Sequence, residues 1–71
     1  MQEVKHLLYE LKLKSIENQK QADKLVRGVS MVNGVSNIEI SIPDKTMIVT
    51  SDTEAYHDII NALEENGGYL E

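Results

Sequence analysis

The chain has no cysteine, tryptophan or phenylalanine, and it has only one proline in 71 residues. The absence of cysteine excludes disulfides, thiolate zinc sites, thiol nucleophiles and dithiol redox motifs. Its three aromatic residues, all tyrosine, leave little surface for stacking on nucleic-acid bases. The formal net charge of −5 also disfavours binding to a phosphate backbone. The sequence therefore predicts no nucleic-acid partner.

Long apolar runs are absent as well. No stretch has the length of a membrane span, and the start of the chain lacks the apolar core of a signal peptide. With 41% hydrophobic and 27% charged residues, the composition is typical of a globular protein rather than a disordered one. We expect one small cytoplasmic domain without membrane insertion, which buries about 60% of its extended-chain surface.

The first half of the chain contains a clear helix and a clear strand. A helix is predicted over about residues 19–29, with Asn18 as its N-cap, and its apolar stripe is Ala22, Leu25, Val26 and Val29. Gly28 within this helix predicts a close approach to the sheet. The helix should end near Met31, with a turn at Asn33-Gly34. A half-buried strand follows, because isoleucine alternates with polar residues at Ile38, Ile40 and Ile42.

The second half of the chain contains, in order, a turn, a strand and a helix. Residues 43–46 form a turn that begins at the proline, and residues 47–50 form the next strand. In that strand Met47 and Val49 should point inward, and Ile48 should be exposed on the open face. A helix is predicted over about residues 53–65, capped by Ser51 or Asp52, with a buried stripe at Ala55, Ile59, Ala62 and Leu63. Asn66-Gly67-Gly68 ends the helix, and only Tyr69–Glu71 remain for a last strand.

Two parts of this pattern resemble the heavy-metal-associated domain, the small copper-chaperone module. The first is Ile16-Glu17-Asn18-Gln19-Lys20-Gln21-Ala22, followed by Leu25, Val29, Val32 and Gly34-Val35; the second is Ile59, Ala62, Leu63 and Gly67-Gly68-Tyr69. The resemblance implies a ferredoxin-like βαββαβ sandwich of the α+β class. In this fold an antiparallel sheet carries two helices on one face, and here the last strand is short.

The N-terminal residues fit two patterns. A helical stripe runs through Val4, Leu7, Leu8 and Leu11, whereas strand-like alternation runs through Tyr9, Leu11 and Leu13. The resemblance favours a strand over about residues 9–15. Residues 1–8 are then a tail or a short helical turn, and residues 9–71 form the heavy-metal-associated-like domain.

The family's metal loop reads Met-x-Cys-x-x-Cys, and its thiolates hold a soft metal such as Cu(I). By resemblance the two cysteine positions fall on Asn18 and Gln21, and the methionine position falls on Ile16, which can pack inward in its place. Amide oxygens are hard, neutral ligands and suit Cu(I) poorly. We therefore expect no metal and no cofactor, with Asn18 acting as a helix cap and Gln21 as a solvated residue of the first turn.

Other metal ligands in the chain are sparse. Glu54, His57 and Asp58 could share one helix face, but three ligands on one exposed helix make a poor site. His6 lies in the N-terminal tail and offers at most an adventitious site. Met31 and Met47 are interpreted as packing residues. No Ser-His-Asp set and no phosphate-binding glycine loop are present, so an enzyme is not expected.

Charge is distributed unevenly along the chain. Residues 1–27 carry six basic and four acidic groups, whereas residues 28–71 carry one basic and eight acidic groups. Such asymmetry can orient an encounter with a charged partner. In copper chaperones, lysines at the start of the first helix meet an acidic patch on the target protein. By resemblance, the docking candidates here are Lys20, Lys24 and Arg27.

The sequence leaves three hypotheses. The first is a non-enzymatic heavy-metal-associated-like domain that has lost its cysteine site and acts as a protein-interaction or regulatory module related to metal transport. Its partner would be an acidic surface of a metal-transport protein. The second is a metal-binding chaperone with non-cysteine ligands. The third is a ferredoxin-like domain that binds a small ligand or associates with itself through an edge strand.

Overall fold

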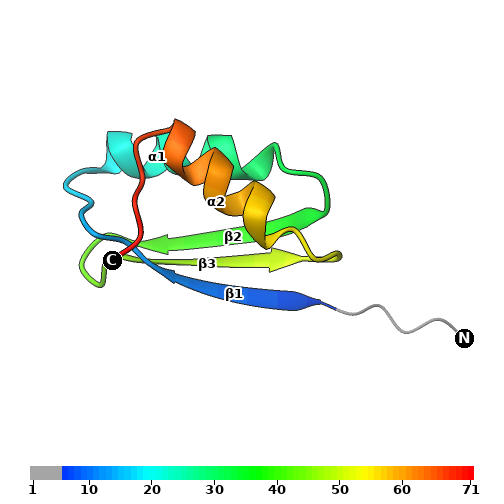
Figure 1. Ribbon diagram of the computed structural model, residues 1–71. Coiled ribbons are helices and arrows are strands. Elements are labelled where there is room, and N and C mark those ends of the chain that lie inside the picture. Colours follow the sequence, from blue (N-terminus) through cyan, green and yellow to red (C-terminus); the bar gives the residue numbers. More distant parts are fainter. Residues whose placement is uncertain (1–5) are drawn as a thin grey trace, which may run out of the picture.

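The computed structural model describes residues 6–71 and shows two helices packed on one face of a three-stranded antiparallel sheet (Figure 1). The elements in chain order are β1 (Leu7–Lys12), α1 (Gln19–Ser30), β2 (Val35–Ser41), β3 (Thr46–Ser51) and α2 (Tyr56–Glu65). Within the sheet the strand order is β1-β3-β2. A single bridge joins Leu70 to Leu13 at the position where the sequence predicts a short last strand. This arrangement confirms the predicted ferredoxin-like sandwich.

The core lies between the sheet and the helices. Strand alternation sends Leu11, Met47 and Val49 toward the helices, and all three are buried. The helices contribute the fully buried Ala22, Leu25, Val29, Ile59 and Leu63 of the predicted stripes. Val26 and Ala62, also predicted in these stripes, are only partly buried. Ile48 faces the open side of the sheet as predicted, but it is half-buried between Glu10 and Glu39 of the neighbouring strands rather than exposed.

Strand β1 begins at Leu7, two residues before the predicted start, and ends at Lys12 rather than near residue 15. The strand pattern prevails over the helical stripe because Leu11 and Leu13 are buried on the sheet, whereas Leu8 is 69% exposed on the open face. The predicted tail or helical turn falls mostly on residues 1–5, which lie outside the described residues.

Helix α2 begins at Tyr56, three residues after the predicted start, and neither predicted cap residue caps it. The Ser51 hydroxyl instead closes a turn, accepting from the Thr53 backbone N–H at 3.3 Å and donating to the Thr53 carbonyl at 2.6 Å. The Asp52 carboxylate lies 3.1 Å from Nδ1 of His6. Ala55 is therefore the N-cap residue, without a side-chain hydrogen bond.

The end of α2 follows the prediction. Gly67 adopts φ +89°, and its N–H donates to the Glu64 carbonyl at 3.1 Å. The Gly68 N–H donates to the Leu63 carbonyl at 2.9 Å, so the two bonds form a Schellman cap. An added Cβ at Gly68 would lie 2.7 Å from Leu25 Cδ2, which shows how closely the chain passes over the core here.

Candidate functional site

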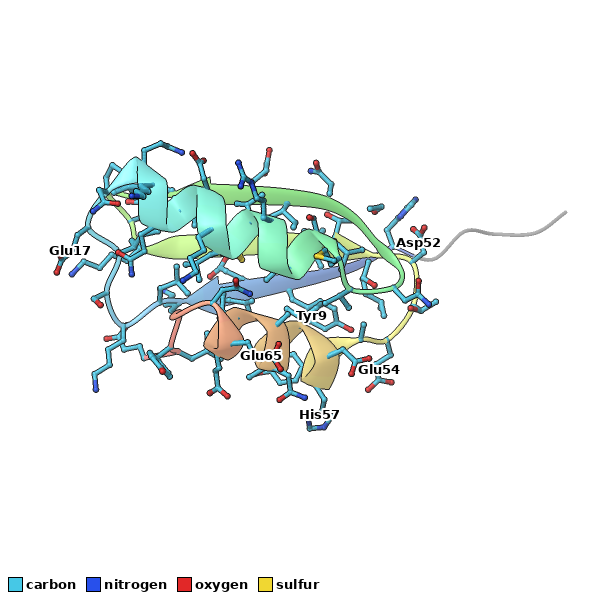
Figure 2. All side chains as sticks on the ribbon, turned by 90° about the horizontal axis from the view of Figure 1, so that it is seen from above. Tyr9, Glu17, Asp52, Glu54, His57 and Glu65 are labelled. Carbon is cyan, nitrogen blue, oxygen red and sulfur yellow. The ribbon has the colours of Figure 1, made fainter. Side chains whose placement is uncertain are left out.

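The loop between β1 and α1 and the first turn of α1 contain Asn18 and Gln21, which the sequence predicts to stand at the family's cysteine positions. Ile16 is 4% exposed and anchors the loop in the core, as predicted for the residue in place of the family's methionine. Glu17 and Asn18, the two residues directly before α1, are exposed. Figure 2 shows Glu17 at this end of the molecule, far from Asp52 at the other.

Asn18 and Gln21 satisfy the backbone at the start of α1. Asn18 has an extended backbone, and its Oδ1 accepts from the Gln21 N–H at 2.8 Å, which confirms the predicted N-cap. In return, Gln21 Oε1 accepts from the Glu17 N–H at 3.1 Å. The two side chains thus form a reciprocal cap, a variant of the capping box in which each amide oxygen binds a backbone N–H.

The role of Gln21 was missed by sequence reasoning, which treated it as a solvated residue. The signal was present, because Asn-x-x-Gln at the start of a helix fits the spacing of the capping box. Both amide oxygens are already used as acceptors of N–H groups. Binding of a metal through them would compete with these bonds, and the ligands offered would be the hard, neutral type that Cu(I) disfavours.

The other candidate ligands do not assemble. Among residues 6–71 the structure contains no group of three His, Asp or Glu side chains that could hold a metal ion. His57 lies edge-on to Tyr56, with ring centroids 6.0 Å apart, and points away from the molecule (Figure 2). Met47 is fully buried in the core as predicted. The packing role predicted for Met31 is wrong, because this residue is the C-cap of α1 and is 86% exposed.

The three basic docking candidates lie together on the outer side of α1. Lys20, Lys24 and Arg27 line one open groove, which also includes Gln19, Asp23 and Asn66. Asn66 comes from the end of α2, and no sequence signal identified it, because its place in the groove depends on how the two helices pack. Within residues 6–71 the only carboxylate in the groove, Asp23, accepts from Gln19 Nε2 at 2.9 Å, and none of the three cations forms a salt bridge.

The sequence matches no protein-family model and no curated protein. Solved structures do match it across nearly the whole chain. Apo-CopP from Helicobacter pylori is 29% identical with a TM-score of 0.81, covering 92% of this chain and 100% of its own. The N-terminal domain of ZntA in its apo form is 19% identical with a TM-score of 0.87, covering 94% of this chain and 92% of that one.

A third match carries the family name in its own description. The apo HMA domain of the copper chaperone for superoxide dismutase is 19% identical with a TM-score of 0.75, covering 94% of this chain and 68% of that one. The protein has the heavy-metal-associated fold. The resemblance inferred from the loop and the two helices is therefore confirmed, and this heavy-metal-associated-like domain carries no cysteine.

In this heavy-metal-associated-like domain the loop and the helix start are held by side chains of the chain itself. The buried Ile16 and the reciprocal cap of Asn18 and Gln21 hold the segment in place. Beside the loop, α1 presents its basic groove to solvent. In the part of the chain that the structure describes, no helix is long and apolar enough to cross a membrane.

Proposed function

We propose that this protein is a non-enzymatic heavy-metal-associated-like domain that has lost its metal site and serves as a protein-interaction or regulatory module in metal transport. The observation that carries the proposal is the reciprocal cap, in which Asn18 and Gln21 bind backbone N–H groups. By resemblance, these two residues stand where the family has its cysteines. The fold is shared with apo-CopP, with the N-terminal domain of ZntA and with the HMA domain of a copper chaperone. This shared fold supports the assignment to metal transport. A cytoplasmic location is part of this proposal.

The docking face in this proposal is the basic groove of Lys20, Lys24 and Arg27. These cations lie on one side of one helix and have no carboxylate partner within residues 6–71, so they are free to meet an external acidic surface. A cluster of exposed charges of one sign steers association with a complementary patch and makes the encounter rate depend on salt. The partner would be an acidic surface of a metal-transport protein.

The first experiment is an anaerobic Cu(I) titration of the wild-type protein against a competing chromogenic chelator, with Zn(II) in parallel. We expect the chelator to keep the metal, because the chain offers no thiolate and no group of three ligands within residues 6–71. Uptake of one equivalent of either metal would overturn the loss of the site. It would instead support a chaperone with non-cysteine ligands.

Docking is tested with ¹⁵N-labelled protein titrated with acidic domains of metal-transport proteins from the same organism. We expect chemical-shift changes along α1, and we expect Lys24→Glu and Arg27→Glu to weaken binding in a salt-dependent manner. Lys12→Glu makes the same charge change on the open face of the sheet and serves as the control. Shift changes elsewhere, or equal weakening by the control, would contradict this docking face.

A further inference from the structure

The chain contains the same dipeptide, asparagine followed by glycine, at Asn33-Gly34 and at Asn66-Gly67. This pair is chemically fragile, because glycine has no side chain to shield its backbone nitrogen. That nitrogen can attack the amide carbon of the preceding asparagine and expel the amide nitrogen as ammonia. The dipeptide alone makes both places equally reactive, so the surroundings in the folded chain decide which of them reacts.

Asn66 and Gly67 are held in place at the end of α2. Nδ2 of Asn66 donates to the Ala62 carbonyl at 2.7 Å, and the side chain packs against Gly28 of α1. The N–H of Gly67 donates to the Glu64 carbonyl at 3.1 Å as part of the Schellman cap. The departing nitrogen and the attacking nitrogen of this pair are therefore both fixed by hydrogen bonds, and the reaction would break both bonds.

Asn33 and Gly34 are the two central residues of the β-turn between α1 and β2. The Val35 N–H donates to the Val32 carbonyl across this turn at 3.2 Å, and Gly34 has φ +94°, as the third residue of a type II turn requires. Asn33 is exposed. Among residues 6–71 neither the side-chain amide of Asn33 nor the N–H of Gly34 has a hydrogen-bond partner. Neither reacting group has to break a bond of this kind.

We propose that Asn33 is a site of spontaneous deamidation in the folded protein, whereas Asn66 is protected by its hydrogen bonds. The backbone nitrogen of Gly34 gives up its proton and bonds to Cγ of Asn33, and the Cγ–Nδ2 bond breaks. Nδ2 takes up a proton and leaves as ammonia, so a succinimide ring remains. Water then opens the ring, its hydroxyl going to a carbonyl carbon and its other proton to the ring nitrogen. Cleavage of the new bond gives aspartate, and cleavage of the original peptide bond gives isoaspartate.

The isoaspartate product would change how this turn contacts the turn that follows β3. The Gly34 carbonyl accepts from the Asp52 N–H at 2.8 Å, and the buried Ser51 hydroxyl lies 3.2 Å from the same oxygen. These contacts join the two turns at one end of the molecule (Figure 1). Isoaspartate lengthens the backbone before Gly34 by an extra methylene group, so it shifts this carbonyl and weakens both contacts. Aspartate adds the same charge on a backbone of normal length.

The two pairs also differ in their relation to the basic groove. Asn66 lines that groove, and a carboxylate in its place would lower the positive charge of the docking face. Asn33 lies outside the groove, so its conversion leaves the three cations without a new acidic neighbour. The inference therefore goes beyond the proposed function, and the docking face and the deamidation can each fail without the other.

The proposal is tested by ageing the wild-type protein in warm, mildly alkaline buffer and following each asparagine by peptide mass spectrometry. Asn33 should convert at least about tenfold faster than Asn66, because two hydrogen bonds must break before Asn66 reacts. In guanidinium chloride, where the chain is unfolded, the two should convert at similar rates, because each precedes a glycine. Equal rates in the folded protein, faster conversion at Asn66, or an Asn33 that reacts only in denaturant would overturn the proposal.

Gly28→Ala is the matched variant for the protected pair, because the added methyl group displaces the Asn66 side chain from Ala62. It should speed conversion at Asn66 and leave the rate at Asn33 unchanged. Asn33 is thus an internal control, since general unfolding would bring both rates toward their values in denaturant. An unchanged rate at Asn66 would show that its bond to Ala62 gives no protection.

The effect on the turn is measured on the aged protein after chromatographic separation of its products, with isoaspartate identified by enzymatic methylation of its carboxylate. The isoaspartate product should unfold at a lower denaturant concentration than Asn33→Asp, which carries the same charge on a normal backbone. This difference would support the weakened contacts of the Gly34 carbonyl. Equal unfolding midpoints would contradict them.

Discussion

At the scale of single residues, Asn18 and Gln21 stabilise the start of α1 and the loop before it through their side-chain amides. A helix start leaves four backbone N–H groups without intrahelical partners, and the loop before it adds more. Asn18 and Gln21 each satisfy one such group. The pair therefore contributes to folding stability in a way that metal-binding thiolates do not.

This role predicts that Asn18→Ala lowers the free energy of unfolding by about 1 kcal/mol, the usual cost of losing an N-cap. The measurement is urea unfolding followed by circular dichroism. Asn18→Asp should retain most of the stability, because a carboxylate accepts the same N–H and suits the positive end of the helix. Asn61→Ala, an exposed position in the middle of α2, is the control. A midpoint for Asn18→Ala equal to that of the wild type would show that the cap contributes nothing.

Residue roles set by local sequence were the predictable ones. Asn18 as a cap and Ile16 as an anchor depend on their immediate neighbours, and the structure confirms both. The side chain of Met31 was predicted wrongly, because its burial depends on the path of the chain after the helix. Asn66 could not be assigned to the basic groove, since only the packing of α2 against α1 brings it there.

At the scale of elements, Gly28 of α1 lies against the side chain of Asn66 at the end of α2. The sequence predicted that Gly28 lets α1 approach the sheet, and this is wrong, since an added Cβ would instead meet the side chain of Asn66 at the end of α2. Asn66 in turn donates from Nδ2 to the Ala62 carbonyl at 2.7 Å. Helix periodicity located the apolar stripes of both helices correctly. Helix periodicity gave no information on which part of the protein lies against Gly28.

The contact predicts that Gly28→Ala destabilises the protein, even though alanine is favoured over glycine in a helix by up to about 1 kcal/mol. The new methyl group displaces the Asn66 side chain and breaks its bond to Ala62, which outweighs the gain in propensity. In an Asn66→Ala background the clash disappears, so the same substitution should stabilise. The double-mutant cycle is measured by urea unfolding. Gly28→Ala with the same sign in both backgrounds would refute the contact.

The start of α2 also could not be located from local sequence alone. Ser51 and Asp52 are good cap residues by type, and the sequence placed the helix directly after them. In the structure the buried Ser51 hydroxyl is used within the turn to Thr53, and Asp52 lies beside His6. Both side chains are used by partners that only the folded chain brings near. A local pattern identifies a residue that can cap a helix, but tertiary contacts decide whether it does.

At the scale of the whole molecule, side chains of the chain itself hold the helices, the sheet and the loop before α1 together. The core is closed by apolar residues from all five elements, and the loop is held by Ile16 and the reciprocal cap rather than by a metal ion. The overall architecture was predictable because the stripes of the helices and the alternation of the strands point to one arrangement. The place of Asn66 beside Gly28 was not, since it depends on how the two helices pack.

The proposed correspondence between this loop and the family's metal loop predicts that cysteines introduced at positions 18 and 21 bind metal. The double variant Asn18→Cys, Gln21→Cys should bind one Cu(I) per chain, because the backbone already presents both positions at the start of α1. Without metal it should unfold more easily than the wild type, by about 1–2 kcal/mol, since both capping bonds are lost. Saturation with Cu(I) should then raise its unfolding midpoint, because a ligand that binds only the folded state stabilises it.

The control for this variant is Asn18→Ser, Gln21→Ser, which introduces small polar side chains without soft ligands. Serine is a good N-cap, so this protein should keep more stability than the dicysteine variant and should leave Cu(I) with the chelator. Both are measured by anaerobic competition and by thermal unfolding with and without metal. If the dicysteine protein gains no Cu(I) binding, the loop does not correspond to the family's metal loop. The proposed loss of a metal site would then have no basis, although the fold would be unaffected.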